Sequence, residues 1–222
     1  MRTARRAAEA TGLLGALSRR SSMVATHLRS MFAIHDPIEL ASMDLVWWSY
    51  PAIRRVDEFL RLRGKARVFE YGSGASTAWL GRRSAEVHSA EHDEIFAEQM
   101  HDLLADVPGV TLHVVPPTQA TSQTVVRSER KGNRDLDFAS YVATIDRVGG
   151  TFDLVIIDGR ARVHAFDRAL EHLAPDGLIV FDNINRPRYR RVLKRPGLRF
   201  ELLRGATPSL PYPTTTALAS FV

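Results

Sequence analysis

The sequence has 222 residues, a formal net charge of +5 and no cysteine. The lack of cysteine excludes disulfides, thiolate zinc sites and cysteine nucleophiles, and no stretch approaches the roughly 20 apolar residues of a membrane-spanning helix. The length indicates one α/β-sized domain. Because a cysteine-free chain fits a reducing compartment, we expect a cytoplasmic protein.

The N-terminal stretch MRTARRAAEATGLLGALSRRSS is basic and nearly free of acidic residues. Its apolar run from Gly12 to Leu17 is shorter than the roughly 7 to 15 residues of a secretory signal. We expect residues 1–37 to form a basic helical extension that packs on the domain or lies peripherally on a membrane surface. The 27 arginines and three lysines are spread along the chain, so no specific nucleic-acid partner is expected.

The segment IELASMDLVWWSYPAIRRVDEFLRL has apolar residues at helical spacing, interrupted by Pro51. It predicts two helices, or one kinked helix, that form a helical cap over residues 38–63. Trp47, Trp48 and Tyr50 lie near the break and are expected to form walls over a pocket, together with the loop discussed below.

After Gly64, short apolar runs alternate with amphipathic segments, which predicts parallel βαβ units in a doubly wound sheet that fills residues 64–222. The runs DLVIID and GLIVFD fit strands covered on both faces. The expected strands are 66–71, 85–91, 111–115, 152–158 and 177–182, and the expected helices are 76–83, 92–104, 137–148 and 162–172.

Two strand-like runs, 198–203 and 215–222, have no room for a helix between them. They predict an antiparallel hairpin at one edge of the sheet, which completes a sheet of seven strands. Residues 116–134 show neither helical nor strand periodicity and are typical of a long surface loop or lid.

The segment 68-VFEYGSGASTAWL-80 closes the first strand with a glycine loop. A nicotinamide fingerprint needs G-x-G-x-x-G, but Gly72 and Gly74 are followed by Thr77 where the third glycine would stand. Glu70 would repel a pyrophosphate and would favour a cationic ligand. The loop therefore disfavours an NAD-dependent oxidoreductase.

The pattern Glu-x-Gly-x-Gly, with Glu91 closing the second strand, resembles class I S-adenosylmethionine-dependent methyltransferases. The segments FDLVIIDGR and PDGLIVFDN and the terminal hairpin resemble further motifs of that family, over roughly residues 47–222. The resemblance implies a seven-stranded Rossmann-like fold with N-terminal helices, and S-adenosyl-L-methionine as the cofactor.

The resemblance also implies roles for single residues. Glu70 would engage the methionine end of the cofactor, and Glu91 would accept hydrogen bonds from the ribose hydroxyls. His92, with Asp93 beside it, would border the adenine. The other cofactor-binding residues implied are Gly72, Ser73, Gly74, Ser76, Thr77 and Asp158, of which Ser76 and Thr77 could equally be helix caps.

Asp158 and the pair Asp182-Asn183 end the fourth and fifth strands. In catechol and caffeoyl-coenzyme A type O-methyltransferases, which this part resembles, the matching residues hold a divalent cation. The resemblance implies Mg²⁺ at Asp158, Asp182 and Asn183. The chain departs from that group at Gly159-Arg160, which is closer to a bacterial branch of class I enzymes.

Without a metal, the catalytic base would be Asp158 or His164. Arg160 and Arg162 would either bind an anionic acceptor or pair with Asp158 or Asp182 and hold the loops. We expect O-methylation of a small molecule or glycan. An RNA- or protein-directed methyltransferase is the alternative, although the chain lacks an RNA module and the Asn/Asp-Pro-Pro-Tyr/Phe signature. A homodimer is compatible with the sequence.

Overall fold

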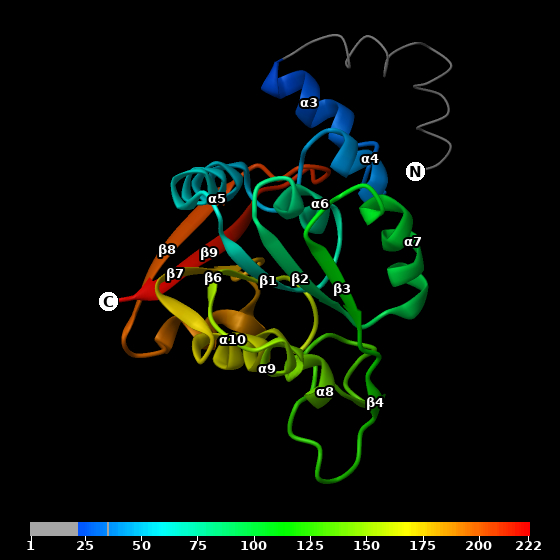
Figure 1. Ribbon diagram of the computed structural model, residues 1–222, viewed down its shortest axis with the longest axis vertical. Helices are drawn as coiled ribbons and strands as arrows, with labels where there is room; N and C mark the ends of the chain where they lie inside the picture. Colours follow the sequence, from blue (N-terminus) through cyan, green and yellow to red (C-terminus); the bar gives the residue numbers. More distant parts are fainter. Residues whose placement is uncertain (1–21, 35) are drawn as a thin grey trace.

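The computed structural model describes residues 22–34 and 36–222 (Figure 1). Most of the predicted basic extension, residues 1–37, therefore lies outside the described part of the chain. In the described part of this extension, the helix α3 (Met23–Ser30) is capped by Ser22, whose hydroxyl accepts a hydrogen bond from the Ala25 amide at 3.2 Å. None of the described helices is long and apolar enough to cross a membrane.

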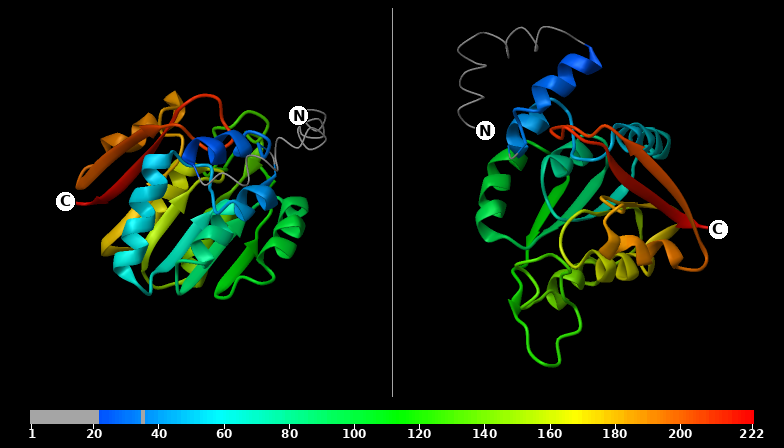
Figure 2. Two further views of the ribbon diagram at one scale, coloured as in Figure 1. Left: turned by 90° about the horizontal axis from the view of Figure 1, so that it is seen from above. Right: turned by 180° about the vertical axis from the view of Figure 1, so that it is seen from behind.

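The domain is built on a seven-stranded sheet with the order β3-β2-β1-β6-β7-β9-β8. The first five strands in that order are parallel, and β9 pairs antiparallel with both β7 and β8. This confirms the predicted doubly wound, Rossmann-like sheet with a C-terminal hairpin at one edge (Figure 2). The strands are β1 (Arg67–Tyr71), β2 (Glu86–Glu91), β3 (Val110–Val114), β6 (Phe152–Ile157), β7 (Leu173–Phe181), β8 (Leu198–Gly205) and β9 (Thr214–Phe221).

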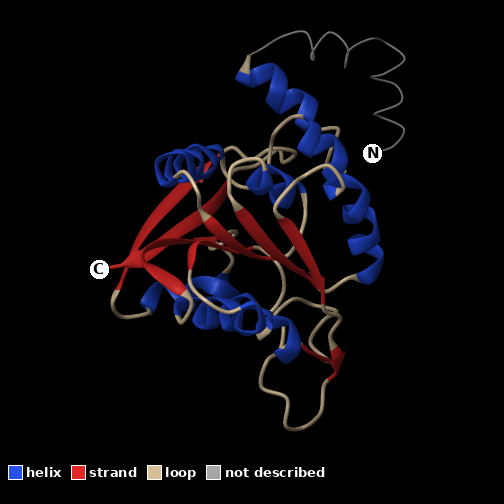
Figure 3. Cartoon of the chain, viewed as in Figure 1, coloured by secondary structure: helices blue, strands red, loops and turns tan. Residues whose placement is uncertain are grey.

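Helices cover both faces of this sheet (Figure 3). Alternate side chains of β1 point to opposite faces, so Val68 packs with Trp48 and Trp79 on one side and Phe69 packs with Tyr141 on the other. The first face carries α5 (Tyr50–Arg63), α6 (Ala75–Gly81) and α7 (Glu94–Leu104); the second carries α8 (Ala139–Val142), α9 (Thr144–Val148) and α10 (Arg162–Leu170) (Figure 1).

The helical cap consists of two helices, α4 (Pro37–Ser42) and α5, and not of one kinked helix. Pro51 lies in the first turn of α5, where its missing amide hydrogen costs no helical hydrogen bond. Ser49 caps this helix with its hydroxyl and also donates to the Leu203 carbonyl at 2.8 Å. The cap is thereby tied to the terminal hairpin.

Two local expectations differ from the structure, and one further element was not predicted. The helix predicted over 137–148 is broken into α8 and α9 at Ala143, where ψ is 2°. The predicted loop 116–134 contains β4 (Thr118–Gln119), which pairs with β5 (Leu136–Asp137), and projects from the body of the domain (Figure 1). A 3₁₀ helix, η1 (Pro187–Lys194), follows β7. Strands of two residues are too short to show a period in the sequence, and a 3₁₀ helix repeats every three residues and not every 3.6.

Candidate active site

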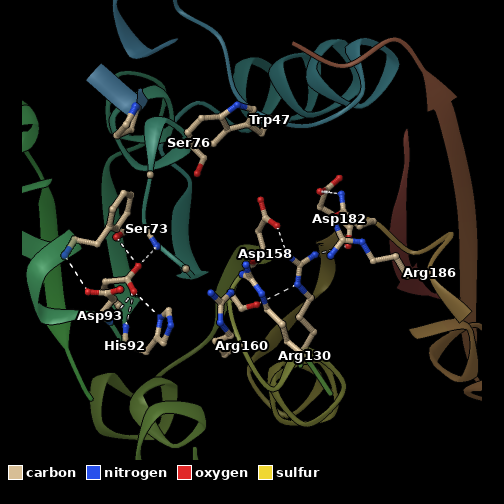
Figure 4. Close-up of a pocket in the computed structure, with 18 of the residues that line it drawn as sticks. Trp47, Ser73, Ser76, His92, Asp93, Arg130, Asp158, Arg160, Asp182 and Arg186 are labelled. Carbon is tan, nitrogen blue, oxygen red and sulfur yellow. Dashed lines mark hydrogen bonds and ion pairs between the residues drawn. The ribbon is translucent and has the colours of Figure 1, made fainter. Parts of the chain in front are cut away.

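A cavity of about 630 Å³ lies at the carboxyl ends of β1, β2, β6 and β7 (Figure 4). Four loops line it, each following one of these strands: the glycine loop after β1, the turn from Glu91 to Asp93, the segment Asp158 to Arg162, and the segment Asp182 to Arg186. Ligands of doubly wound sheets bind at this edge. The volume is in the range of small-molecule and cofactor pockets.

The two glycines of the first loop, Gly72 and Gly74, are suited to their positions for different structural reasons. Gly72 has a φ of +97°, and a Cβ added to it would lie 2.6 Å from the Gly159 Cα. Only glycine fits this close backbone approach. Gly74 has an extended φ of 170°, and an added Cβ would meet nothing closer than Trp47 and Ser76 at 3.8 Å. Since both neighbours line the cavity, the missing side chain of Gly74 leaves space for a ligand.

Glu70 lies behind the wall of the cavity, because its side chain is 0% exposed. Its carboxylate accepts hydrogen bonds from the hydroxyls of Ser76 at 2.5 Å, Thr77 at 2.6 Å and Ser89 at 2.7 Å. Burial raises the pKa of Glu70 to about 7, although these hydrogen bonds act to lower it. Of this group only Ser76 lines the cavity. Glu70 therefore positions Ser76 and reaches the cavity through it.

Thr77 is also buried, and its hydroxyl caps the helix by accepting the Gly74 amide at 2.9 Å. Of the two predicted hydroxyls, Thr77 thus serves α6 and Glu70, whereas Ser76 faces the cavity. The alternative of ordinary helix caps, left open for both residues, applies to Thr77.

Glu91 lines the cavity from the end of β2 and is 2% exposed. One carboxylate oxygen accepts the amide and hydroxyl of Ser73 at 3.1 and 2.8 Å, and the other accepts the amides of His92 and Asp93 at 2.7 and 2.9 Å. Burial acts to raise the pKa of Glu91, but His92 and these donors outweigh it, so the pKa lies below its usual value. The cavity therefore holds an ionised carboxylate at this position.

Asp158 and Asp182 end β6 and β7, and Arg162 lies between them. The Arg162 guanidinium donates to the Asp158 carboxylate at 2.5 Å, to the Asp182 carbonyl at 2.6 Å and to the Gly159 carbonyl at 3.1 Å. Arg162 opens α10, directly after Ala161 at a φ of +47°. Of the two roles expected for Arg162, the structure therefore shows the pairing with Asp158 that holds the loop.

Burial raises the pKa of both acids. Asp182 is 2% exposed, and burial together with the nearby Asp158 charge raises its pKa to about 7. The Asp158 side chain is 22% exposed within the cavity, and burial raises its pKa although Arg162 and Arg186 act to lower it. Arg162 engages one carboxylate oxygen of Asp158, and no hydrogen bond within the described residues engages the other.

The arrangement of Asp158, Asp182 and Asn183 does not fit a bound Mg²⁺. Asp182 accepts from the Thr216 hydroxyl at 2.7 Å and from the Asn183 amide, so its carboxylate and that amide satisfy each other. The Arg162 cation already neutralises Asp158. In residues 22–34 and 36–222, no group of three or more histidine, aspartate or glutamate side chains is arranged to hold a metal ion.

Some predicted residues lie away from the cavity. His164 is not among the residues that line it, so the structure does not bring this candidate base to the site. Trp48 is fully buried in the core and Tyr50 contacts His27 instead, which leaves Trp47 as the aromatic wall from the helical cap (Figure 4). The expectation that all three aromatic residues form the wall is wrong for Trp48 and Tyr50.

Sequence reasoning missed several lining residues. Arg186 follows Asp182-Asn183 by three residues, and its place after a strand end could have indicated it. Arg130 comes from the loop 116–134, which was expected to form a wall without any single residue being named. Ile34 and Leu210 come from segments without any motif, so no signal in the sequence could have found them.

A family model described as a methyltransferase domain matches residues 69–184, which is more than half of the chain. The matched segment runs from β1 to just after β7. It contains the four loops of the cavity, apart from residues 185 and 186 at the end of the last loop. A search of curated proteins returned no match.

Solved structures share the fold at low sequence identity. The O-methyltransferase TomG of Streptomyces achromogenes, described as involved in tomaymycin synthesis and in complex with S-adenosylmethionine, is 20% identical, with 84% of this chain and 90% of that chain covered and a TM-score of 0.60. Cofactor-bound Rv0187 from MTB is 22% identical, with 90% and 93% covered and a TM-score of 0.60. A Bacillus cereus O-methyltransferase in complex with S-adenosylhomocysteine is 15% identical, with 87% and 90% covered and a TM-score of 0.61.

Proposed function

Since this chain belongs to the methyltransferase-domain family and is an S-adenosylmethionine-dependent methyltransferase, we propose that it methylates a hydroxyl oxygen of a small molecule or glycan. The observation that carries the proposal is the pairing, in one cavity, of an ionised Glu91 at the end of β2 with Asp158, an acid of raised pKa, at the end of β6. The first suits cofactor binding and the second suits proton transfer.

The residues of the first two loops fit the cofactor. Glu91 presents a carboxylate that suits the two ribose hydroxyls, and Ser73 and His92 hold it in place. The open space at Gly74 and the hydroxyl of Ser76 suit the methionine part. When bound, the cofactor supplies a methyl group on a positively charged sulfur, which is activated for attack without further chemistry by the protein.

Asp158 is the proposed general base. Because its pKa is raised by burial, its carboxylate accepts a proton more readily near neutral pH than an exposed aspartate does. Its oxygen that is not bonded to Arg162 is the one that would take the hydroxyl proton of the acceptor. Arg162 acts as a positioning residue, since its guanidinium donates to both the carboxylate and the main-chain carbonyl of Asp158.

The proposal is tested with radiolabelled S-adenosylmethionine and a panel of hydroxylated phenols, sugars and hydroxy acids. We expect label in a methyl ether, which resists mild alkali. Label that mild alkali releases as methanol would indicate a carboxyl methyl ester instead. Label incorporated into RNA or protein, with none in the small molecules, would support the macromolecular alternative and overturn the proposal.

A further inference from the structure

Four arginines line the cavity, and three of them have no acidic partner. Arg162 is paired with Asp158. Arg130, Arg160 and Arg186 form no ion pair with an acidic side chain anywhere in residues 22–34 and 36–222. They come from three different segments: the loop before β5, the loop after β6 and the loop after β7. We call Arg130, Arg160 and Arg186 the arginine cluster.

The arginine cluster lies around the ends of β6 and β7, and Arg160 is also near enough to Glu91 for that carboxylate to act on its pKa. Figure 4 shows Arg130, Arg160 and Arg186 around Asp158 and Asp182, across from Asp93. Because Asp158 is already paired with Arg162, and Asp158 and Asp182 both have raised pKa values, the two acids do not balance three further cations. This side of the cavity therefore has an excess of positive charge.

Two observations show that this charge is not satisfied within the protein. The Nε of Arg160 is buried without a hydrogen-bond partner among the described residues, an arrangement that is unfavourable unless a ligand supplies one. Burial, followed by the charge of Arg130, lowers the pKa of Arg160, and burial, followed by the charge of Arg162, lowers the pKa of Arg186. By contrast, the guanidinium of Arg63 pairs with the carboxylates of Asp153 and Asp176.

The cofactor of the proposed function does not remove this excess. S-adenosylmethionine carries a sulfonium, an ammonium and one carboxylate, so its own net charge is positive. A cationic cofactor beside the arginine cluster favours an anion as the second ligand. Guanidinium groups bind carboxylates and phosphates through paired hydrogen bonds.

We infer that the methyl acceptor is a small hydroxylated molecule with a negatively charged group, a carboxylate or a phosphate, that the arginine cluster binds. This inference rests on the proposed function and names the class of its acceptor. The hydroxyl of the acceptor faces Asp158, while its charged group lies against Arg130, Arg160 and Arg186. The charge then selects the acceptor and orients its hydroxyl.

Inorganic phosphate serves as the probe for this site. It is titrated by calorimetry, at constant ionic strength, into protein saturated with S-adenosylhomocysteine. We expect saturable binding to the wild type, and about fivefold or more weaker binding for Arg160→Gln and for Arg186→Gln, the scale of losing one charged hydrogen bond. Arg190→Gln removes the same charge from an exposed residue outside the cavity and is expected to leave the phosphate affinity unchanged.

A wild type that shows no saturable phosphate binding overturns the inference, and so does an equal loss of affinity in Arg190→Gln. The first stage of the titration separates this failure from that of the proposed function. If S-adenosylhomocysteine does not bind, the proposed function fails and the inference fails with it. If S-adenosylhomocysteine binds and phosphate does not, only the anionic acceptor is excluded.

Discussion

Arg162 donates to Asp158 twice, at 2.5 Å to the carboxylate and at 2.5 Å to the main-chain carbonyl. The same guanidinium donates to the carbonyls of Gly159 and Asp182, so each of its three nitrogens is bound to the chain. Arg162 is therefore a fixed cation between the ends of β6 and β7. It neutralises Asp158 and leaves the second carboxylate oxygen of that acid without a hydrogen-bond partner among the described residues.

The first prediction follows from this fixed cation. Because Arg162 neutralises Asp158 and the Asn183 amide is bonded to the Asp182 carboxylate, we expect no saturable binding of Mn²⁺, used as a paramagnetic probe for Mg²⁺ sites, in electron paramagnetic resonance titrations. Methyl transfer should also persist in EDTA. Loss of turnover in EDTA that Mg²⁺ restores would show that Asp158, Asp182 and Asn183 do hold a metal during the reaction.

The second prediction concerns the base. Asp158→Asn keeps the size of the side chain and an oxygen for Arg162 but cannot take a proton, so kcat should fall by about 100-fold or more. Affinity for S-adenosylhomocysteine should change less than about twofold if Asp158 acts only on the acceptor. In the wild type, kcat should rise with pH through the raised pKa of Asp158, since only the ionised form accepts a proton. An unchanged kcat in Asp158→Asn would exclude this role.

The third prediction uses the two glycines of the first loop as a matched pair. Gly72→Ala should destabilise the fold by about 1 to 3 kcal/mol, because φ is +97° and the new Cβ would clash with the Gly159 backbone. Gly74→Ala should leave the stability nearly unchanged but weaken cofactor binding about fivefold or more, as its methyl group takes space in the cavity. Urea unfolding and calorimetry measure the two effects. The reverse pattern would mean that the roles are exchanged.

The fourth prediction concerns pH and stability. Folding raises the pKa of Glu70 to about 7, so the native state holds a proton that the unfolded state releases above its lower pKa. The contribution of Glu70 is therefore full below the unfolded pKa and is lost as the pH rises to about 7. Glu70→Gln should lose less stability than the wild type between pH 5 and pH 8, by up to about 3 kcal/mol.

Urea unfolding at several pH values measures this difference, and Glu98→Gln, an exposed position on α7, is the control. Asp182 contributes in the same direction in both proteins, so only the difference between wild type and variant reports on Glu70. Parallel stability profiles for wild type and Glu70→Gln would show that Glu70 is ionised in the folded protein across this range.

Much of the fold could be predicted because strands and loops carry distinct local signals. The apolar run of β6 predicts a strand, and the Gly-Ser-Gly segment after β1 predicts a tight loop, from neighbouring residues alone. Glu91 could also be identified as a site residue from its local sequence, because an acidic residue at the end of an apolar strand is unusual. The doubly wound sheet and the terminal hairpin followed from these local patterns, whereas the order of the strands was not predicted.

Features that depend on several distant residues could not be predicted. Nothing in the sequence distinguishes Arg162, which is bound on all sides, from Arg160, whose Nε has no partner among the described residues. Likewise, Glu70 has the same local pattern whether it faces the ligand or, as here, is covered by Ser76, Thr77 and Ser89. These differences arise from packing between elements.

Whether Glu91 binds the cofactor is decided by calorimetric titration of S-adenosylhomocysteine into wild-type protein, Glu91→Ala and Glu86→Ala. Glu86 lies at the opposite end of the same strand, outside the cavity, and serves as the matched control. We predict one saturable site in the wild type, unchanged affinity in Glu86→Ala and more than about tenfold weaker binding in Glu91→Ala. Equal affinity in all three proteins, or no binding to the wild type, would contradict the account.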